Sequence, residues 1–362
     1  MTFRKPAIST QSPGLRSSSL RRVVLGALLA LLLPAGCGRF APHAHREYVY
    51  VWVKDMYLRD RVAPVNKRVA RATNGEQLEV LEEDGRFTKV MTPDGKVGWL
   101  PNETVIDEAT YDRFQLLAKD TAHNPVLSKG ILRESYWLRD APGRDSDRFY
   151  LLEPNTKLEL LERVSLPRPE PAWLLPAGKS GKPAPPELED FWLARDGRGQ
   201  VGWVRGGVLD EDVPEDIAIL IPDEKVVAAY VIRKVSDPEA NTPDGLVPEY
   251  LAALTPWKAG LPYDFDQIRV FTWNVRRHRY ETAYLEHDLE GYLPVKVGKE
   301  TFGREADPVF SFEVATDDSA RIDAKTGRAE PGTAATESFR MEGVIVRKIS
   351  GPEPEKRLRA PK

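Results

Sequence analysis

An internal repeat constrains the fold of this chain more than any other feature. The tetrapeptide YLRD at residues 57–60 recurs 80 positions later as WLRD at 137–140. The segment LEVLE at 78–82 recurs at the same offset as LELLE at 158–162. Two segments that keep one spacing predict two copies of a single small folding unit.

A third segment repeats at a different offset. RFTKVMTPDGKVGWL at 86–100 matches DFWLARDGRGQVGWV at 190–204, which lies 104 positions later. The difference of 24 between the two offsets predicts an insertion in the second copy. Residues 166–189 are rich in proline and glycine and show no sustained hydrophobic period, so we expect them to form a surface loop.

Each copy has the composition of a small β fold. EYVYVWV at 47–53 and QLEVLEE at 77–83 are rich in β-branched and aromatic residues and alternate in character. Pro93-Asp94-Gly95 stands between two short runs and predicts a hairpin turn. Short strands with tight turns favour one small barrel over 47–107 and a second over 128–213.

The order of these segments resembles that of the bacterial SH3-like (SH3b) domain. That family shows an Asn-Val-Arg element, a turn, a valine-rich strand and a closing Gly-Trp-Val. The resemblance covers residues 48–106 and 130–209, with Tyr-Leu and Trp-Leu in place of Asn-Val. It implies SH3-like barrels that bind a peptidoglycan peptide or a protein partner in a groove. The candidate ligand-binding residues are Tyr57, Trp99, Trp137 and Trp203.

Trp99 and Trp203 have two interpretations. In a strand, Val97 and Trp99 share one face, while Gly98 and Leu100 share the other. A barrel of this size needs its large side chains for its core, which favours a core role for both tryptophans. The resemblance instead implies that they line the groove. If they form the core, Tyr57 and Trp137 are the better groove candidates.

The remaining segments predict linkers and a third domain. Residues 108–127 form a helical linker in this interpretation, because Tyr111, Phe114 and Leu117 recur at helical spacing. Strand-like runs over 217–350 predict a larger antiparallel sandwich or open barrel with one short helix, VPEYLAAL. We expect residues 351–362 to form a disordered tail. The predicted fold class is therefore mainly β, with two SH3-like barrels in tandem followed by the larger β domain.

Residues 1–36 have the pattern of an export signal. Basic residues precede an apolar run at 23–36, which is too short to cross a bilayer. The run ends in Leu-Pro-Ala-Gly before Cys37 and resembles the lipobox of bacterial lipoproteins, with Pro34 where the family has Leu, Val or Ile. The resemblance implies that Cys37 is lipidated, by palmitate among other chains, and begins a linker over 37–46. An ordinary secretory signal with an incidental cysteine is the alternative.

The charge pattern bears on the partners of the exported chain. The formal net charge is −3, and residues 1–36 hold five cations and no acidic residue. Removing the signal therefore gives −3 − 5 = −8. An acidic chain without a basic stripe is not typical of nucleic-acid binding. The signal instead predicts a membrane-anchored protein of the bacterial envelope, on the periplasmic side or in the outer membrane.

Few residue patterns favour catalysis. Cysteine peptidases need a thiolate nucleophile, and the only cysteine, Cys37, belongs to the predicted signal. His43 and His45 lie in the linker, and His278 and Glu281 are expected on opposite strand faces, so we expect no metal site and no cofactor. These observations favour a non-catalytic protein. The alternative is a cell-wall hydrolase in which the barrels target a carboxylate-based C-terminal catalytic domain.

The segment FTWNVRRHRYETAY in the third domain predicts a β-hairpin. We expect Phe271 and Trp273 on one face of its first strand and Tyr280 and Tyr284 on one face of its second. The turn between them would then carry a group of cations that either faces water or contacts an anionic partner. The candidate contact residues are Arg276, Arg277 and Arg279, beside His278.

Overall fold

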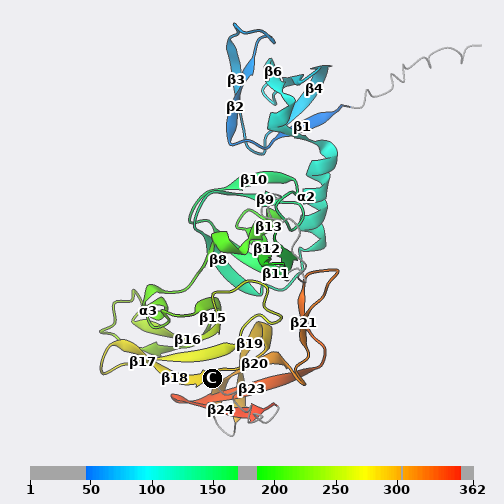
Figure 1. The fold of residues 1–362 in the computed structure, drawn as a ribbon. Helices are drawn as coiled ribbons and strands as arrows, with labels where there is room; N and C mark the ends of the chain where they lie inside the picture. Colours follow the sequence, from blue (N-terminus) through cyan, green and yellow to red (C-terminus); the bar gives the residue numbers. More distant parts are fainter. Residues whose placement is uncertain (1–45, 170–185, 303–304, 352–362) are drawn as a thin grey trace, which may run out of the picture. The chain divides into compact units, whose positions relative to one another are not determined.

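The computed structural model describes residues 46–169, 186–302 and 305–351 (Figure 1). The predicted signal, Cys37, nearly all of the linker and residues 352–362 lie outside the described residues, as does 170–185 within the predicted insertion. The described chain is built mainly of antiparallel sheets, so the predicted fold class is confirmed. No helix among these residues is long and apolar enough to cross a membrane.

The first repeat forms a seven-stranded sheet in the order β3-β2-β6-β5-β4-β1-β7. Buried and less buried residues alternate along the strands, and the buried ones face the interior of the barrel. In β5, every second residue is buried. Leu58, Leu78, Val90 and Leu100 are fully buried in that interior. Its strands are β1 (Tyr48–Val51), β2 (Asp55–Arg59), β3 (Arg68–Thr73), β4 (Gln77–Asp84), β5 (Phe87–Met91), β6 (Val97–Pro101) and β7 (Val105–Asp107), with a 3-10 turn, η1 (Asn102–Thr104), before β7.

The second repeat has the same topology, in the order β10-β9-β13-β12-β11-β8-β14. Both copies carry a bulge in the long strand, after Val80 and after Leu160, at the repeat offset of 80. The last three elements of each copy match at the offset of 104. The elements are β8 (Ser128–Leu132), β9 (Tyr136–Arg139), β10 (Arg148–Leu152), β11 (Lys157–Pro167), β12 (Leu188–Asp196), β13 (Val201–Arg205), η3 (Gly206–Val208) and β14 (Leu209–Glu211).

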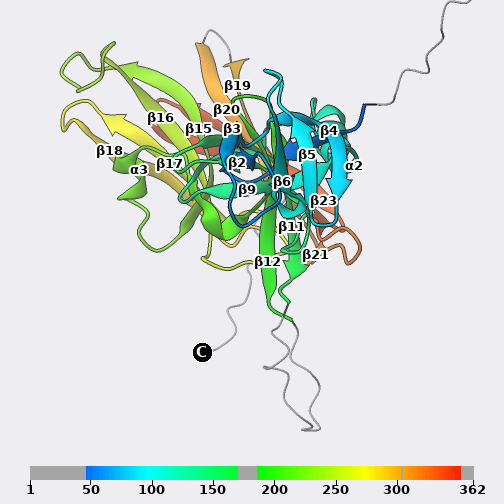
Figure 2. The same cartoon turned by 90° about the horizontal axis from the view of Figure 1, so that it is seen from above.

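The predicted insertion loop is shorter than the sequence suggests. Leu166 pairs with Glu189 and Pro167 with Leu188, so both ends of 166–189 belong to the hairpin of β11 and β12 (Figure 2). Pro167 is tolerated because it lies at the last position of its strand, where a missing N–H costs little.

Gly98 and Gly202 explain why both copies keep the Val-Gly-Trp sequence. A Cβ atom on Gly98 would lie 2.8 Å from Cβ of Leu58, and one on Gly202 would lie 2.6 Å from Cβ of Leu138. The strands therefore cross at a distance that only glycine permits. This crossing joins β6 to β2 and β13 to β9, and so closes each barrel.

Helix α2 (Glu108–Asp120) lies between the repeats. Asp107 caps it by accepting a hydrogen bond from the backbone N–H of Thr110 at 2.8 Å. Tyr111 stacks on Tyr50 of the first barrel at 3.8 Å between ring centroids, and Phe114 is buried among core residues of the second barrel. The helix thus contributes to the packing of both barrels.

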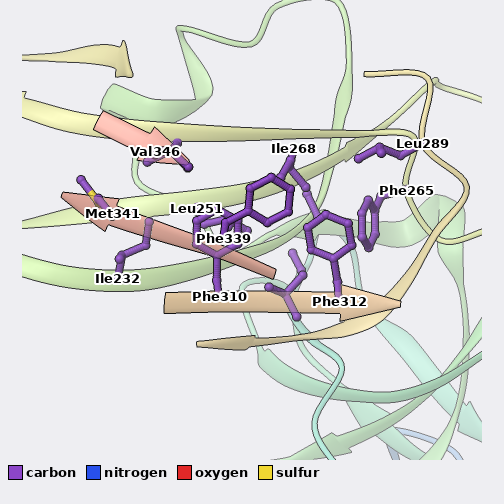
Figure 3. Close-up of a cluster of buried hydrophobic side chains, with 14 of the residues drawn as sticks. Ile232, Leu251, Phe265, Ile268, Leu289, Phe310, Phe312, Phe339, Met341 and Val346 are labelled. Carbon is purple, nitrogen blue, oxygen red and sulfur yellow. The ribbon is translucent and has the colours of Figure 1, made fainter. Parts of the chain in front are cut away.

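The third domain consists of two four-stranded sheets packed face to face. Three phenylalanines, Phe310, Phe312 and Phe339, stack between the sheets (Figure 3). The first sheet is β15-β16-β17-β18 and the second is β19-β20-β23-β24. The strands are β15 (Lys225–Ser236), β16 (Leu246–Thr255), β17 (Gln267–Asn274), β18 (Arg279–Glu286), β19 (Gly291–Phe302), β20 (Glu305–Ala315), β23 (Ala334–Glu342) and β24 (Ile345–Ser350), with a small pair, β21 (Ala320–Ile322) and β22 (Ala329–Pro331), and a short helix, α3 (Glu215–Ala218).

The helix expected at VPEYLAAL is wrong, because this segment lies in β16. The strand pairs with β15 on one side and β17 on the other. Leu251 and Ala253 face the core between the sheets, while Ala252 and Leu254 pack under α3. A strand that is buried on both faces shows no alternation, so its apolar run resembles a buried helix.

The predicted hairpin is present as β17 and β18, but the prediction for Tyr284 is wrong. Trp273 pairs with Tyr280 in register, with ring centroids 4.9 Å apart. The register then shifts, so that Val270 pairs with Tyr284. Because of this bulge, Tyr280 packs with the α3 cluster whereas Tyr284 contacts Phe339 between the sheets.

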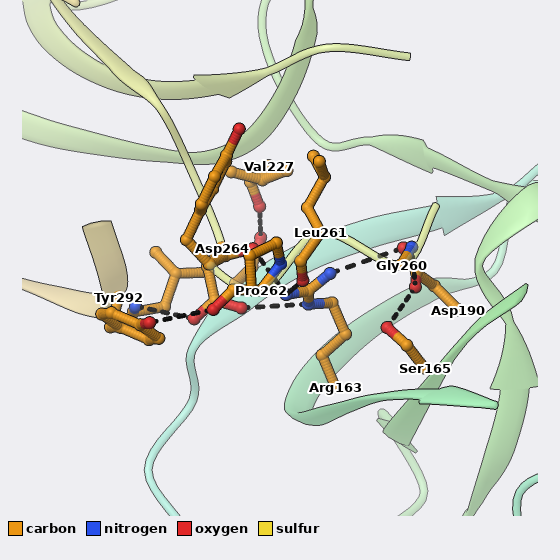
Figure 4. Close-up of polar contacts among 12 residues, drawn as sticks. Arg163, Ser165, Asp190, Val227, Gly260, Leu261, Pro262, Asp264 and Tyr292 are labelled. Carbon is orange, nitrogen blue, oxygen red and sulfur yellow. Dashed lines mark hydrogen bonds and ion pairs between the residues drawn. The ribbon is translucent and has the colours of Figure 1, made fainter. Parts of the chain in front are cut away.

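A buried arginine connects the second barrel to the third domain (Figure 4). Arg163 on β11 has only 8% of its side chain exposed. Its Nε donates to Oδ1 of Asp264 at 3.0 Å, and its Nη2 donates to the carbonyls of Leu261 and Tyr263. Asp190 lies 3.5 Å from Nη1 on the other side. Both carboxylates also accept backbone N–H bonds, from Leu293 and Gly260 respectively.

Candidate functional site

The first barrel carries an open groove beside the loop that joins β2 to β3. The groove has two hollows, and Arg59, Asn66 and Pro101 line both of them. Nη1 of Arg59 donates to Oδ1 of Asn66 at 3.1 Å, so the two side chains form a ridge between the hollows. Arg59 also pairs in register with Trp99 across the barrel closure, which fixes the position of the ridge.

The first hollow is mainly apolar. It measures about 440 Å³, and its walls include Val62 and Pro64 from the loop and Phe87 and Trp99 from the neighbouring strands. Phe87 and Trp99 are half-buried. Nζ of Lys89 lies 5.6 Å from the Trp99 ring centroid, which leaves a cation at the edge of this surface.

The second hollow combines an aromatic ring with a cation. It measures about 370 Å³ and is lined by Tyr57 and Arg68, with Met56 and Thr104 beside them. Tyr57 is 41% exposed, although it is a large apolar ring. The Arg68 guanidinium lies 4.3 Å from the centroid of that ring. Stacking of this kind holds the guanidinium in place while its N–H groups stay available.

Asp60 fixes the loop that forms one wall of the groove. Its Oδ1 accepts the backbone N–H of Lys67 at 2.8 Å, and its Oδ2 accepts Nε of Arg61 at 3.1 Å. These two hydrogen bonds hold the pKa of Asp60 below its ordinary value. The carboxylate is therefore engaged within the loop, and the cations Arg59 and Arg68 dominate the groove itself.

The corresponding surface of the second barrel is filled by other parts of the chain. Trp137, which corresponds to Tyr57, donates from Nε1 to the carbonyl of Trp52 at 3.0 Å. The Arg148 guanidinium lies 4.3 Å from the Trp52 ring and 5.5 Å from the Trp137 ring. Arg148 therefore lies beside two aromatic rings, whereas the corresponding Arg68 in the first barrel lies beside one.

Helix α2 covers the remainder of that surface. Trp203, which corresponds to Trp99, is 7% exposed and packs with Leu117 of the helix. Leu161 beside it is 3% exposed, whereas the corresponding Leu81 in the first barrel is 45% exposed. On the adjoining loop, Arg113 of the helix pairs with Asp140 at 2.7 Å and also with Asp147.

The core interpretation fits Trp203 better than Trp99, because Trp203 is 7% exposed in a buried hydrophobic cluster whereas Trp99 is half-buried. Trp99 and Trp203 both project from the outer face of their strand, while Leu100 and Val204 face inward. Trp203 is buried in a cluster with Phe191, Leu193 and Val201, to which Leu117 of α2 adds. Among the four predicted aromatic residues, Tyr57 and Trp99 line the open groove, and Trp137 and Trp203 contribute to internal contacts.

Sequence reasoning missed several groove residues. Asn66 and Phe87 lie outside the repeated tetrapeptide and the Val-Gly-Trp segment, and Arg59 lies within the tetrapeptide but is not among the four candidate residues. One signal could have found the loop wall: Val62 and Pro64 are apolar residues within a segment otherwise typical of an exposed turn.

The predicted cationic tip of the β17–β18 hairpin contains its own counter-charges. Oε1 of Glu281 accepts from Arg277 at 3.2 Å and from Arg279 at 3.0 Å. Nδ1 of His278 lies 2.8 Å from Oδ2 of Asp237, and its Nε2 lies 3.3 Å from Glu239. Arg276 makes no side-chain ion pair with the described residues. A role of the tip in binding an anionic partner stays a prediction.

Buried carboxylates in the third domain are paired within the fold. Glu249 is 1% exposed and bonds to Arg233 at 2.5 Å. Glu337 is 4% exposed, and Lys348 donates to it at 2.6 Å. Burial raises the pKa of Glu337 above its ordinary value. In the described part of the chain, no group of three or more His, Cys, Asp or Glu side chains could hold a metal ion.

Comparisons with known proteins give one family match. Residues 56–106 match the family model described as the bacterial SH3 domain, which covers most of the first barrel and both hollows of the groove. No curated protein matches the chain.

Three solved structures are similar to parts of the chain. One is an NlpC/P60 family protein from Bacillus cereus, at 13% identity and a TM-score of 0.22, covering 45% of this chain and 55% of that chain. The second is NlpC2 from Trichomonas vaginalis, at 8% identity and a TM-score of 0.16, covering 80% of this chain and 96% of that one. The third is NlpC1 from the same organism, at 6% identity and a TM-score of 0.15, covering 66% and 87%. The chain thus spans about half the length of the first of these structures.

Proposed function

We propose that the chain is a lipid-anchored, non-catalytic protein of the bacterial cell envelope whose first barrel binds a peptidoglycan peptide. The open groove beside Tyr57 and Trp99 is the observation that carries this proposal. The match of residues 56–106 to the bacterial SH3 domain supports it, since the sequence resemblance implies cell-wall binding.

The two hollows suit a peptide that has both apolar side chains and free carboxylates. Phe87 and Trp99 provide an apolar surface in one hollow, and Arg59 and Arg68 provide donors at the ridge and in the other. Arginine side chains bind carboxylates through paired N–H donors, and aromatic rings add contact area at low entropic cost. The stem peptides of bacterial walls have this combination of groups.

The binding proposal is tested by sedimentation with purified peptidoglycan. We expect the parent chain to sediment with the wall material and Arg59→Gln to reduce the bound fraction at least about fivefold, because a charge-assisted bond contributes about 1.5–3 kcal/mol. Arg71→Gln is the matched control, since Arg71 lies on the same barrel outside both hollows and pairs with Asp55. Equal sedimentation of Arg59→Gln and Arg71→Gln variants would contradict the proposal, and a protein partner would then be the ligand to seek.

The membrane anchor is tested independently of the groove. If Cys37 is acylated, Cys37→Ser moves the protein from the membrane fraction to the soluble envelope fraction. Unchanged membrane association of this variant would remove the lipoprotein assignment and leave the groove proposal intact.

The alternative of a wall hydrolase is decided with the same material. The non-catalytic assignment predicts that peptidoglycan incubated with the chain releases no soluble fragments above a heat-treated control. Release of fragments that disappears on mutation of a carboxylate in the third domain would favour the hydrolase.

A further inference from the structure

A cavity of about 430 Å³ lies between the second barrel and the third domain. Trp192 and Leu209 of the barrel and Val227, Thr255 and Leu261 of the third domain contribute to its walls. Its size is within the range of sites that hold small ligands. The Arg163 ion pairs form part of the same wall.

The acceptors in this wall are already engaged. Asp264 accepts from Arg163 and from the backbone N–H of Leu293. Asp190 accepts from the hydroxyl of Ser165 at 2.6 Å and from the N–H of Gly260 at 3.0 Å, with Arg163 beside it. The two carboxylates therefore complete the domain interface and offer little to a ligand.

The donors around the cavity are not all engaged. Oγ1 of Thr255 is buried and has no hydrogen-bond partner among the described residues. Trp192, which lines the same cavity, is 6% exposed. Lys258 at the rim pairs with no carboxylate of the described chain. A buried polar group without a partner is destabilising, and a hydrogen bond to a ligand would remove that cost.

An exposed aromatic ring completes the rim. Trp257 is 64% exposed, and it stands next to Lys258. An indole in this position offers a flat apolar surface beside a positive charge.

We propose that this cavity binds a small organic anion, with its carboxylate or phosphate group held by Lys258 and the Thr255 hydroxyl, and its apolar or ring portion against Trp257. The Lys258 ammonium donates hydrogen bonds and accepts none, and the Thr255 hydroxyl can donate one, so the complementary ligand is rich in acceptors. This site is separate from the groove of the first barrel and does not depend on the function proposed for it.

The test uses the purified full chain and three probes, with calorimetry as the readout. The probes are N-acetylphenylalanine, its uncharged amide, and phenyl phosphate. We expect at least one of the two anions to bind at least tenfold more tightly than the amide. The two anions distinguish a carboxylate from a phosphate ligand. Equal binding of both anions and the amide, or no binding of any probe, would overturn the proposal.

Two variants place the binding in the cavity. Lys258→Gln is expected to weaken anion binding at least threefold. Thr255→Val replaces the hydroxyl with a methyl group of similar size and is also expected to weaken anion binding. Lys299→Gln, on a lysine of β19 that does not line the cavity, is the matched control and should bind as the parent does. If the Lys258→Gln and Lys299→Gln variants bind equally, the proposal is wrong. A thermal unfolding scan of each variant shows whether it is folded, and peptidoglycan sedimentation of the Lys258→Gln variant should equal that of the parent.

Discussion

At the scale of single residues, Asp237 connects two parts of the third domain through a pH-sensitive contact. Its Oδ2 accepts Nε1 of Trp273 at 2.7 Å and lies 2.8 Å from Nδ1 of His278. The Trp273 hydrogen bond is the main cause that lowers the pKa of Asp237, with the His278 contact adding to it. A carboxyl whose pKa is lower in the folded state stabilises the fold above its unfolded pKa, and this stabilisation is lost as the pH falls through its folded pKa.

We therefore expect Asp237→Asn to lower the Tm at pH 7, and the difference from the parent to shrink as the pH falls below about 4, the ordinary pKa of the group. Thermal unfolding between pH 2.5 and pH 7 measures this. Asp223→Asn is the control, since Asp223 is exposed and forms no side-chain contact with the described residues. A difference that stays constant over the whole pH range would show that Asp237 acts through shape rather than charge.

At the scale of secondary-structure elements, helix α2 distinguishes the two barrels. Trp203 lies under the helix, whereas the corresponding Trp99 faces an open hollow. We expect Trp203→Ala to destabilise the chain by about 3–5 kcal/mol, as for a buried aromatic side chain. Trp99→Ala should cost less than about 1.5 kcal/mol, because that side chain is only half-buried. Urea unfolding of both variants makes the comparison, and equal losses would contradict the assignment of α2 as the cover of the second barrel.

The secondary-structure elements differ in how far they could be predicted from the sequence. The barrels were predictable because their strands alternate and because the repeat keeps one offset on each side of the insertion. Strand β16 was not predictable, since burial on both faces removes the alternation of apolar and polar residues. The difference between an open and a filled groove was not predictable either. It depends on where α2 and Trp52 pack, and the two repeats carry similar residues at both surfaces.

At the scale of the whole described chain, polar contacts join the second barrel to the third domain. Tyr230 of β15 donates to the carbonyl of Leu127 at 2.9 Å and accepts the N–H of Val295 at 3.2 Å. Burial raises the pKa of Tyr230 to about 12, so the hydroxyl stays protonated and able to donate at physiological pH. The Arg163 network adds directional contacts at the same interface. Such directional contacts fix the positions of the residues that form the walls of the adjacent cavity.

Arg163 provides the clearest test of this interface. Its side chain is 8% exposed and holds two buried carboxylates, so removing it leaves both charges without their main partner. We expect Arg163→Leu to reduce the free energy of unfolding by about 3–5 kcal/mol. Arg328→Leu is the matched control, since Arg328 pairs with Glu162 at 2.7 Å but is 56% exposed, and exposed pairs contribute about 0–1 kcal/mol. Urea unfolding at pH 7 compares the two. Adding Asp264→Asn to Arg163→Leu should recover part of the loss, because one uncompensated charge is removed. Equal losses for the two arginine variants would show that the buried network does not stabilise the contact between the domains.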